Sequence, residues 1–248
     1  MLEEIIDACH YLLNNYSAAE KIKDYIDNRL TKESQEKFQV GYFPNTENIQ
    51  ALISLVGEDI LIKNNLLIKR EIEDSLYPRK VNLLTFEEHP LIMPYKDAYG
   101  KTIAIVGRSI LSESERKVSK YKNTAFEKSK HLFGLYENKK NILNKGGVFI
   151  VEGQIDTIKA LEYGLDNVVS IGSSSLSDNQ FSLITRYTNN IYLLLDNDEA
   201  GEKGRKRITD RFSKYANIYN FYIPEEYKDI DEYLTKDPNK SLSFVIKH

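Results

Sequence analysis

The side chains best suited to chemistry are six carboxylates in the second half of the chain, each close to the end of a short apolar run. One follows its run directly and has a second carboxylate one helical turn later. The other four form two D-x-D pairs, each after a further run. These residues are Glu152, Asp156, Asp196, Asp198, Asp229 and Asp231. Carboxylates that come together raise one another's pKa unless cations lie between them. Mg²⁺ suits such a set because it takes oxygen ligands and is bound through one or two carboxylates, water and substrate phosphates.

Short strands that alternate with helices would bring these acids together. The expected strands are 148–151, 168–171, 191–195 and 218–223, and the stretches with helical spacing between them are 154–163, 178–187 and 199–214. Ser177 and Gln180 have the spacing of a capping box for the middle helix. Strand–helix alternation is typical of βαβ units and a mostly parallel sheet, whose carboxyl strand ends share one edge. We therefore predict that acids from three strand ends converge at that edge.

The spacing within each motif adds to this prediction. Asp196 and Asp198 would point the same way on an extended segment, so both can reach one pair of metal ions. The turn from Gly172 to Ser175 opens a helix and could present backbone N–H groups to a phosphate. A lone D-x-D or a lone Gly-Ser run is more often an ordinary turn. Only their joint occurrence after consecutive strands indicates a site.

The first half of the chain predicts an α+β part. Residues 1–30 read as helices, 31–75 as mostly helical with a break at 41–44, and 91–110 as a hairpin that turns at 97–100. The expected fold class is therefore α/β (α+β overall). An N-terminal α+β subdomain, about 1–144, is followed by a mostly parallel sheet flanked by helices, about 145–248.

Composition excludes several classes of protein. The 248 residues include 29% charged and 41% hydrophobic residues, and the formal net charge is −3, which argues against coating nucleic acid through bulk charge. Residues 101–130 nevertheless contain eight Lys or Arg and three acids. The single cysteine, Cys9, permits neither a disulfide within the chain nor a cysteine-rich zinc site. No apolar run is long enough to span a bilayer, and the N-terminus is unlike a signal peptide, so we expect a cytoplasmic protein with no membrane partner.

Two segments resemble a known signature. EGQID (152–156) and LLLDNDEAG (193–201) resemble the Toprim motif of primases, topoisomerases and some nucleases. The resemblance to bacterial-type (DnaG-like) DNA primase catalytic cores extends over roughly residues 10–236, in order. It includes DYIDNRLTKESQEKFQVGYFP, IMPYKDAYGKTIAIVGRSI, KYKNTAFEKSKHLFGLYE and KDIDEYL.

This resemblance implies a function and roles for residues. It implies template-directed synthesis of short RNA primers on single-stranded DNA from ribonucleoside triphosphates, by two-metal nucleotidyl transfer with Mg²⁺, for which Mn²⁺ can substitute. The central metal-site and catalytic acids would be Glu152, Asp196 and Asp198, supported by Asp156, Asp229 and Asp231. The residues that would contact template or nucleotide phosphates are Arg108, Lys120, Asn123, Lys128 and Lys130.

The chain also departs from the family pattern. Bacterial-type primases carry an N-terminal zinc module, a helical region after the acidic segment and a helicase-binding tail, and none of these is found in this sequence. We therefore expect no zinc in this chain, and a zinc-module protein or replicative helicase as partners in trans. A minimal primase of a phage or other mobile element fits this pattern, and so does an excised core. The alternatives are a Toprim-type nuclease and a non-catalytic nucleic-acid-binding module derived from a primase core; a topoisomerase fits the length less well.

Overall fold

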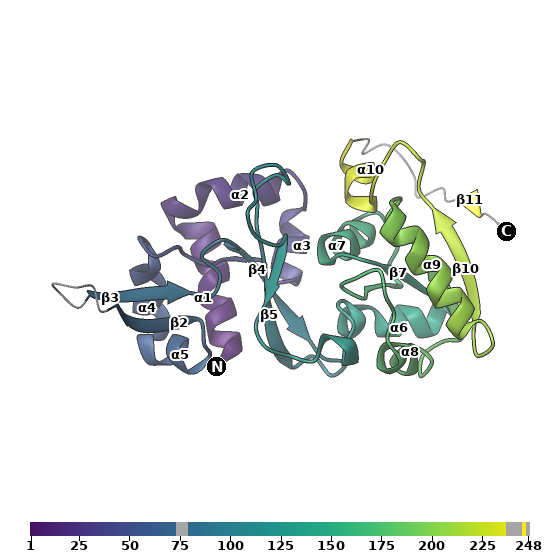
Figure 1. Cartoon of the computed structure of the whole chain (residues 1–248), viewed down its shortest axis with the longest axis horizontal. Helices are drawn as coiled ribbons and strands as arrows, with labels where there is room; N and C mark the ends of the chain where they lie inside the picture. The colour runs from purple at the N-terminus through teal and green to yellow at the C-terminus, as the bar shows by residue number, and fades with distance from the viewer. Residues whose placement is uncertain (73–78, 237–244, 247–248) are drawn as a thin grey trace. The chain divides into compact units, whose positions relative to one another are not determined.

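The computed structural model describes residues 1–72, 79–236 and 245–246. The chain forms two compact units (Figure 1). Unit 1 comprises residues 1–95 and 102–126, and unit 2 comprises residues 96–101 and 127–248. Residues 127–144 thus pack with the second unit, although the sequence predicts them in the first part.

Unit 1 begins with a group of helices in which α1 packs against α2 and α4. Buried side chains recur along α1 at helical spacing, from Ile5 through Cys9 to Leu13, because one face of this amphipathic helix turns to the core. Cys9 is fully buried, which raises the pKa of its thiol. The helices are α1 (Leu2–Asn15), η1 (Ser17–Ala19), α2 (Glu20–Asp27), α3 (Lys32–Lys37), α4 (Ile49–Val56) and α5 (Glu58–Lys63). The expected helical character of residues 1–30 is confirmed.

A four-stranded sheet of order β1-β4-β5-β6 completes this unit. Its strands are β1 (Gly41–Tyr42), β4 (Leu91–Lys96), β5 (Thr102–Arg108) and β6 (Tyr121–Asn123). The expected hairpin is present as β4 and β5, and it turns at Asp97, whose backbone N–H donates to the Lys101 carbonyl over 3.0 Å. Gly100 has φ +94°, a conformation that favours glycine. The break predicted at 41–44 coincides with β1.

The prediction of mostly helical structure for 31–75 is wrong at its end. Residues Leu67–Ile72 form strand β2, which pairs antiparallel with β3 (Arg79–Leu84), for example Lys69 with Asn82. The run LIKREI combines apolar and charged residues with no clear period. A six-residue segment of this kind is decided by its cross-strand partner rather than by its own periodicity.

Unit 2 contains the predicted parallel sheet. Its order is β11-β10-β9-β7-β8, and β10, β9, β7 and β8 are mutually parallel. The strands are β7 (Val148–Val151), β8 (Val168–Ser170), β9 (Asn190–Leu193), β10 (Asn217–Tyr222) and β11 (Val245–Ile246), of which β11 is antiparallel to β10. Each parallel strand lies within about a residue or two of its predicted run, so the α/β prediction is confirmed.

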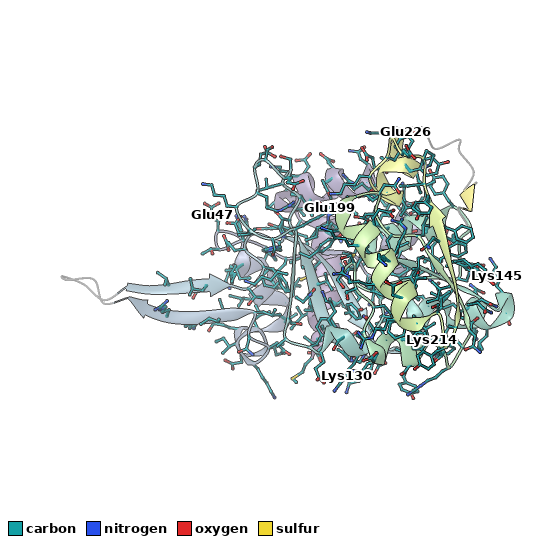
Figure 2. All side chains as sticks on the ribbon, turned by 45° about the vertical axis from the view of Figure 1, so that its right-hand side comes forward. Glu47, Lys130, Lys145, Glu199, Lys214 and Glu226 are labelled. Carbon is teal, nitrogen blue, oxygen red and sulfur yellow. The ribbon has the colours of Figure 1, made fainter. Side chains whose placement is uncertain are left out.

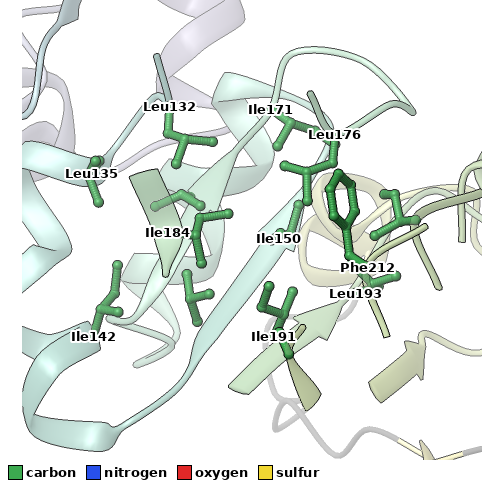
Figure 3. Packing of buried hydrophobic residues seen from close by; sticks show 14 of the residues in the cluster. Leu132, Leu135, Ile142, Ile150, Ile171, Leu176, Ile184, Ile191, Leu193 and Phe212 are labelled. Carbon is green, nitrogen blue, oxygen red and sulfur yellow. The ribbon is translucent and has the colours of Figure 1, made fainter. Parts of the chain in front are cut away.

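Helices cover both faces of this sheet. Ile150, Ile191 and Leu193 pack on one face with Ile184 of α8 and Phe212 of α9 (Figure 3). The alternate residues of the strands pack against α7 and α10, in keeping with the two-residue period of a strand. The helices are α6 (Leu135–Lys145), α7 (Gln154–Glu162), α8 (Asp178–Ile184), α9 (Glu199–Phe212) and α10 (Ile230–Lys236), with the 3₁₀ turn η2 (Lys128–Lys130) before α6.

Local sequence signals set the helix ends. The Ser177 hydroxyl accepts from the Gln180 N–H, and the Gln180 side chain accepts from the Ser177 N–H, so the predicted capping box is confirmed. Figure 2 shows Glu199 at the start of α9 and Lys214 beyond its other end. These are the charge signs that the helix dipole favours at each position. Within the described ranges, no helix combines the length and the apolar character that crossing a membrane would require.

Candidate functional site

Adjacent strands bring Glu152 and Asp196 to one edge of the sheet. Strands β7 and β9 are hydrogen-bonded neighbours with Ile150 opposite Leu193. Glu152 therefore leaves the sheet beside Asp196. The backbone N–H of Asp196 donates to Glu152 Oε1 over 3.4 Å. The convergence expected from strand alternation is present for this pair.

The carboxyl of Asp196 lies at the centre of the acidic group. Burial, first, and then the carboxylates of four other predicted acids raise its pKa to about 8. The four are Asp156, Glu152, Asp229 and Asp198. All four of these neighbours act in the same direction, so a negative charge on Asp196 is unfavourable until a cation compensates it. A site of this electrostatic character fits a cation with oxygen ligands.

Glu152 shares this environment in weaker form. Burial raises the pKa of its carboxyl, and the charge of Asp198 raises it further. The hydrogen bond from the Asp196 N–H and the positive charges of Arg205 and Lys228 oppose that rise. Two basic side chains therefore partly offset the effects of burial and of Asp198 on the pKa of Glu152.

Three of the acids also accept hydrogen bonds from backbone N–H groups at the starts of helices. Asp198 Oδ1 accepts from the Gly201 N–H over 2.9 Å at the start of α9. Asp156 Oδ2, in the first turn of α7, accepts from the Gly153 N–H over 3.0 Å. Asp229 Oδ1 accepts from the Glu232 N–H, in the first turn of α10, over 2.7 Å. Capping fixes the direction of each side chain at its strand end.

Asp198 and Asp231 each make one further contact. Asp198 Oδ2 lies 3.8 Å from the ammonium of Lys228, an exposed residue of the loop after β10. Asp231, the last predicted acid, is only 5% exposed and accepts from the Thr235 hydroxyl within α10 over 3.3 Å. In the described part of the chain, no three His, Cys, Asp or Glu side chains are close enough to enclose an ion by themselves. The arrangement suits a cation that keeps water or phosphate oxygens among its ligands.

Arg205, which the sequence analysis did not single out, supports the edge from α9. Its guanidinium is 2% exposed and donates to the carbonyl oxygens of Asp196, over 3.1 Å, and of Leu195. Gly201 lets α9 approach, because a Cβ there would lie 2.1 Å from the Asp196 carbonyl oxygen. An arginine in register with the buried residues of an amphipathic helix is the signal that could have identified Arg205.

The predicted Gly-Ser turn follows β8 and contacts a residue of the basic segment. Gly172 has φ +71°, and its carbonyl accepts from Lys128 Nζ over 2.9 Å. The Gln180 amide, 3.3 Å from the Lys128 carbonyl, also connects α8 to η2. Lys130 is exposed and pairs with Glu127 over 2.6 Å (Figure 2). The structure therefore brings Lys128, but not the Lys130 ammonium, to the turn.

The other predicted phosphate-binding residues belong to unit 1. Arg108 ends β5 and is 5% exposed, and its Nη1 donates to the Tyr121 hydroxyl over 2.9 Å. Its guanidinium also lies over the rings of Tyr25 and Tyr121, at 5.6 and 5.4 Å. Asn123 lies two residues after Tyr121 on β6, opposite Val106, and Lys120 is exposed. Arg108 is thus held in a rigid aromatic setting, which differs from a mobile surface cation.

Known proteins resemble the chain along nearly its whole length. The family described as DNA primase catalytic core, N-terminal domain, matches residues 9–139, and a Toprim-like family matches residues 149–234. The DNA primase of Aquifex aeolicus is 32% identical over 238 residues, which cover 95% of this chain and 45% of that protein. The DNA primase of Staphylococcus aureus (strain COL) is 26% identical over 253 residues, 100% of this chain and 41% of that protein. The chain therefore spans less than half the length of these relatives.

Solved structures agree with this similarity. The crystal structure of the Aquifex aeolicus primase, containing zinc-binding and RNA polymerase domains, matches with a TM-score of 0.76 and 27% identity, and the match covers 95% of this chain and 57% of that one. A DnaG primase catalytic domain bound to single-stranded DNA matches with a TM-score of 0.73 and 21% identity, over 95% of this chain and 78% of that one. The second likeness concerns the fold alone.

Proposed function

The chain belongs to the family of DNA primase catalytic cores, and from that premise we propose that it synthesises short RNA primers on single-stranded DNA. The observation that carries this proposal is the ordered pair of family matches, 9–139 and 149–234, the second of which contains the acidic edge. A Toprim-like match alone would suit a nuclease equally well, since both reactions need metal and phosphate. The first match distinguishes them.

A divalent metal is the cofactor that the Toprim-like family implies, and the donor set fits one. All candidate ligands are carboxylate oxygens, and Asp196 has a pKa of about 8 because burial and four other carboxylates disfavour its charge. We propose that Glu152, Asp196 and Asp198 hold Mg²⁺, with Mn²⁺ as a substitute, and that Asp156, Asp229 and Asp231 support them. When bound, the metal ions would lower the pKa of the primer 3′-hydroxyl and neutralise charge on the triphosphate.

The reaction is nucleotidyl transfer. The primer 3′-hydroxyl gives up its proton to solvent, its oxygen forms a bond to the α-phosphorus of a ribonucleoside triphosphate, the bond from that phosphorus to the bridging oxygen breaks, and pyrophosphate leaves. The acidic edge would orient the triphosphate for in-line attack. Arg108, Lys120, Asn123, Lys128 and Lys130 would bind template or triphosphate oxygens, and Arg108 is already oriented by Tyr121.

Several further aspects belong to the same proposal. We propose a cytoplasmic protein that works with a zinc-module protein and a replicative helicase, and we keep a phage or other mobile element as its predicted origin.

The division into an N-terminal domain and a C-terminal catalytic domain is also a proposal. The sequence predicts the junction near residue 144, whereas the contact pattern separates the units near 127. The cleavage sites found by limited proteolysis would decide between the two.

Primer extension tests the chemistry separately from initiation. The chain would be given a DNA template with an annealed RNA primer, four ribonucleotides and Mg²⁺ or Mn²⁺, and in parallel single-stranded DNA without primer. We expect metal-dependent extension, lost by at least about 100-fold in Glu152→Gln and Asp196→Asn. The matched control Asp210→Asn changes an exposed acid that pairs with Lys206 and should retain activity. Metal-dependent cutting of the DNA without extension would replace the primase proposal with the nuclease alternative.

A further inference from the structure

Asn197, the middle residue of the D-x-D pair, connects two loops of the acidic edge. Its backbone N–H donates to the Lys228 carbonyl over 2.7 Å. Its side-chain nitrogen lies 3.1 Å from the Ile223 carbonyl oxygen, 3.2 Å from that of Pro224 and 3.0 Å from that of Tyr227. Four hydrogen bonds thus connect Asn197, in the loop after β9, to the segment 223–228 after β10.

The surroundings of the side chain require an amide donor. All three neighbouring groups are carbonyl oxygens, which only accept, so the amide must present its –NH₂ group with two donor hydrogens. An Asp of the same shape would bring a carboxylate oxygen against three carbonyl oxygens. An Ala would leave these carbonyls without the amide, and a Ser hydroxyl has one hydrogen and a shorter reach.

The segment that Asn197 holds leads directly into the last acids of the edge. Asp229 follows it and caps α10, and the N–H of Lys228 donates to Glu232 Oε2 over 2.7 Å within the same turn. Asp229 is one of the carboxylates that raise the pKa of Asp196. The contacts of Asn197 therefore hold the segment that directly precedes Asp229.

Strand pairing does not by itself fix the distance between Asp229 and the carboxylates of Asp196 and Asp198. The register of β9 with β10 runs from Asn190 opposite Asn217 to Leu193 opposite Asn220, so it ends before either acidic loop. Beyond that point the two loops diverge from regular pairing, and α10 packs through its apolar residues on α7. The four hydrogen bonds of Asn197 cross from the loop after β9 to the segment after β10.

We propose that Asn197 is a positioning residue of the metal centre. Its amide holds the segment 223–228, and with it Asp229, at the separation from Asp196 and Asp198 that shared binding of a divalent cation requires. The inference rests on the proposed function in one respect, the assignment of these acids to a divalent metal. Residues that orient metal ligands from outside contribute about 10- to 100-fold to metal affinity, which is the loss we expect without the amide.

The test is direct titration of the whole chain with Mn²⁺, in which electron paramagnetic resonance reports the free ion and no catalysis is needed. The variants are wild type, Asn197→Ala, Asn197→Ser and Asp196→Asn. The matched control is Asn190→Ala, at the opposite end of β9, where the side chain also donates to a backbone carbonyl, that of Gly146, over 2.7 Å. Thermal unfolding in EDTA confirms that each variant folds.

We expect Asn197→Ala to raise the half-saturating Mn²⁺ concentration about 10- to 100-fold, Asn197→Ser to raise it less, and Asn190→Ala to leave it unchanged. In primer extension, Asn197→Ala should need correspondingly more Mn²⁺ but approach the wild-type rate at saturation. A general structural defect would not be rescued by the ion in this way.

The remaining outcomes separate the inference from the proposed function. Equal Mn²⁺ affinity of wild type and Asn197→Ala, with binding lost in Asp196→Asn, would overturn the positioning role and leave the metal site in place. Absence of Mn²⁺ binding by the wild type would overturn both. If Asn197→Ala does not fold, Asn197→Ser decides, and unchanged affinity in that variant overturns the role.

Discussion

Replacement of the Asp196 carboxyl by an amide is predicted to stabilise the metal-free protein while abolishing its activity. Asn has nearly the same shape as Asp, and the backbone N–H that donates to Glu152 is retained in Asp196→Asn. The change therefore removes one charge from a partly buried position surrounded by like charges. Residues that are retained for function often lower the stability of a protein, so their replacement can stabilise it while activity is lost.

The size of the effect follows from the pKa of the Asp196 carboxyl. Burial and the surrounding carboxylates raise that pKa to about 8 in the folded protein, against about 3.9 in the unfolded chain. Between these two values the folded state holds the extra proton, so the free energy of unfolding falls as pH rises, by about 1.4 kcal/mol per pH unit. From pH 5 to pH 8 the wild type should lose, relative to Asp196→Asn, up to about 4 kcal/mol.

The assay is urea unfolding followed by circular dichroism in EDTA, at pH 5, 6, 7 and 8. The difference in the free energy of unfolding between Asp196→Asn and wild type should widen steadily over this range. Asp210→Asn serves as control, because Asp210 is exposed and its ion pair with Lys206 is a surface pair worth at most about 1 kcal/mol. Its difference from wild type should stay nearly constant with pH.

Divalent cation should narrow this difference in stability. A ligand that binds only the folded state stabilises it by about 2.7 kcal/mol at 100 times its Kd, and Asp196→Asn should lose most of that gain. Parallel pH profiles of wild type and Asp196→Asn in EDTA would refute the reasoning. Such a result would mean that Asp196 ionises in the folded protein as easily as in the unfolded chain.

Three further changes test other parts of the structure. Gly201→Ala would place a Cβ 2.1 Å from the Asp196 carbonyl oxygen; we expect a loss of about 1–3 kcal/mol in urea unfolding together with weaker Mn²⁺ binding, and unchanged values would show that α9 can move away. Ser177→Ala removes the N-cap of α8 and should lower the free energy of unfolding by about 1 kcal/mol without changing primer extension; a loss of activity at full folding would contradict a purely structural role. Tyr121→Phe removes the hydroxyl that accepts from Arg108; fluorescence anisotropy should show several-fold weaker binding of a single-stranded DNA oligonucleotide, with the folding midpoint little changed, and unaltered binding would argue that the aromatic rings alone orient the guanidinium.

Much of unit 2 could be predicted from the sequence because its signals are local. The runs that became β7 to β10 are short, apolar and separated by stretches of helical spacing, and the Ser177–Gln180 capping box acts within one turn. The position of acids after strands is likewise a property of the sequence. A parallel sheet puts all its carboxyl strand ends on one edge, so convergence followed without knowledge of the strand order.

The sequence was less informative where a partner far along the chain decides the outcome. The run 67–72 became a strand because 79–84 pairs with it, and no periodicity within six residues contains that information. The burial of Arg108 against the rings of Tyr25 and Tyr121 could not be read from the sequence, and its role in phosphate binding stays a prediction. Burial of a cation depends on elements that its own neighbours in sequence do not reveal.

The residue types of the acidic edge were therefore determined by the sequence alone, and their electrostatics only by the tertiary structure. Strand order places β9 between β7 and β10, so Asp196 is flanked by acids from both sides and its pKa rises to about 8. The same order brings Asn197 within reach of the carbonyls of 223–228. Charge repulsion and hydrogen bonding act over a few ångströms, and only the folded chain brings residues so far apart in sequence within that range.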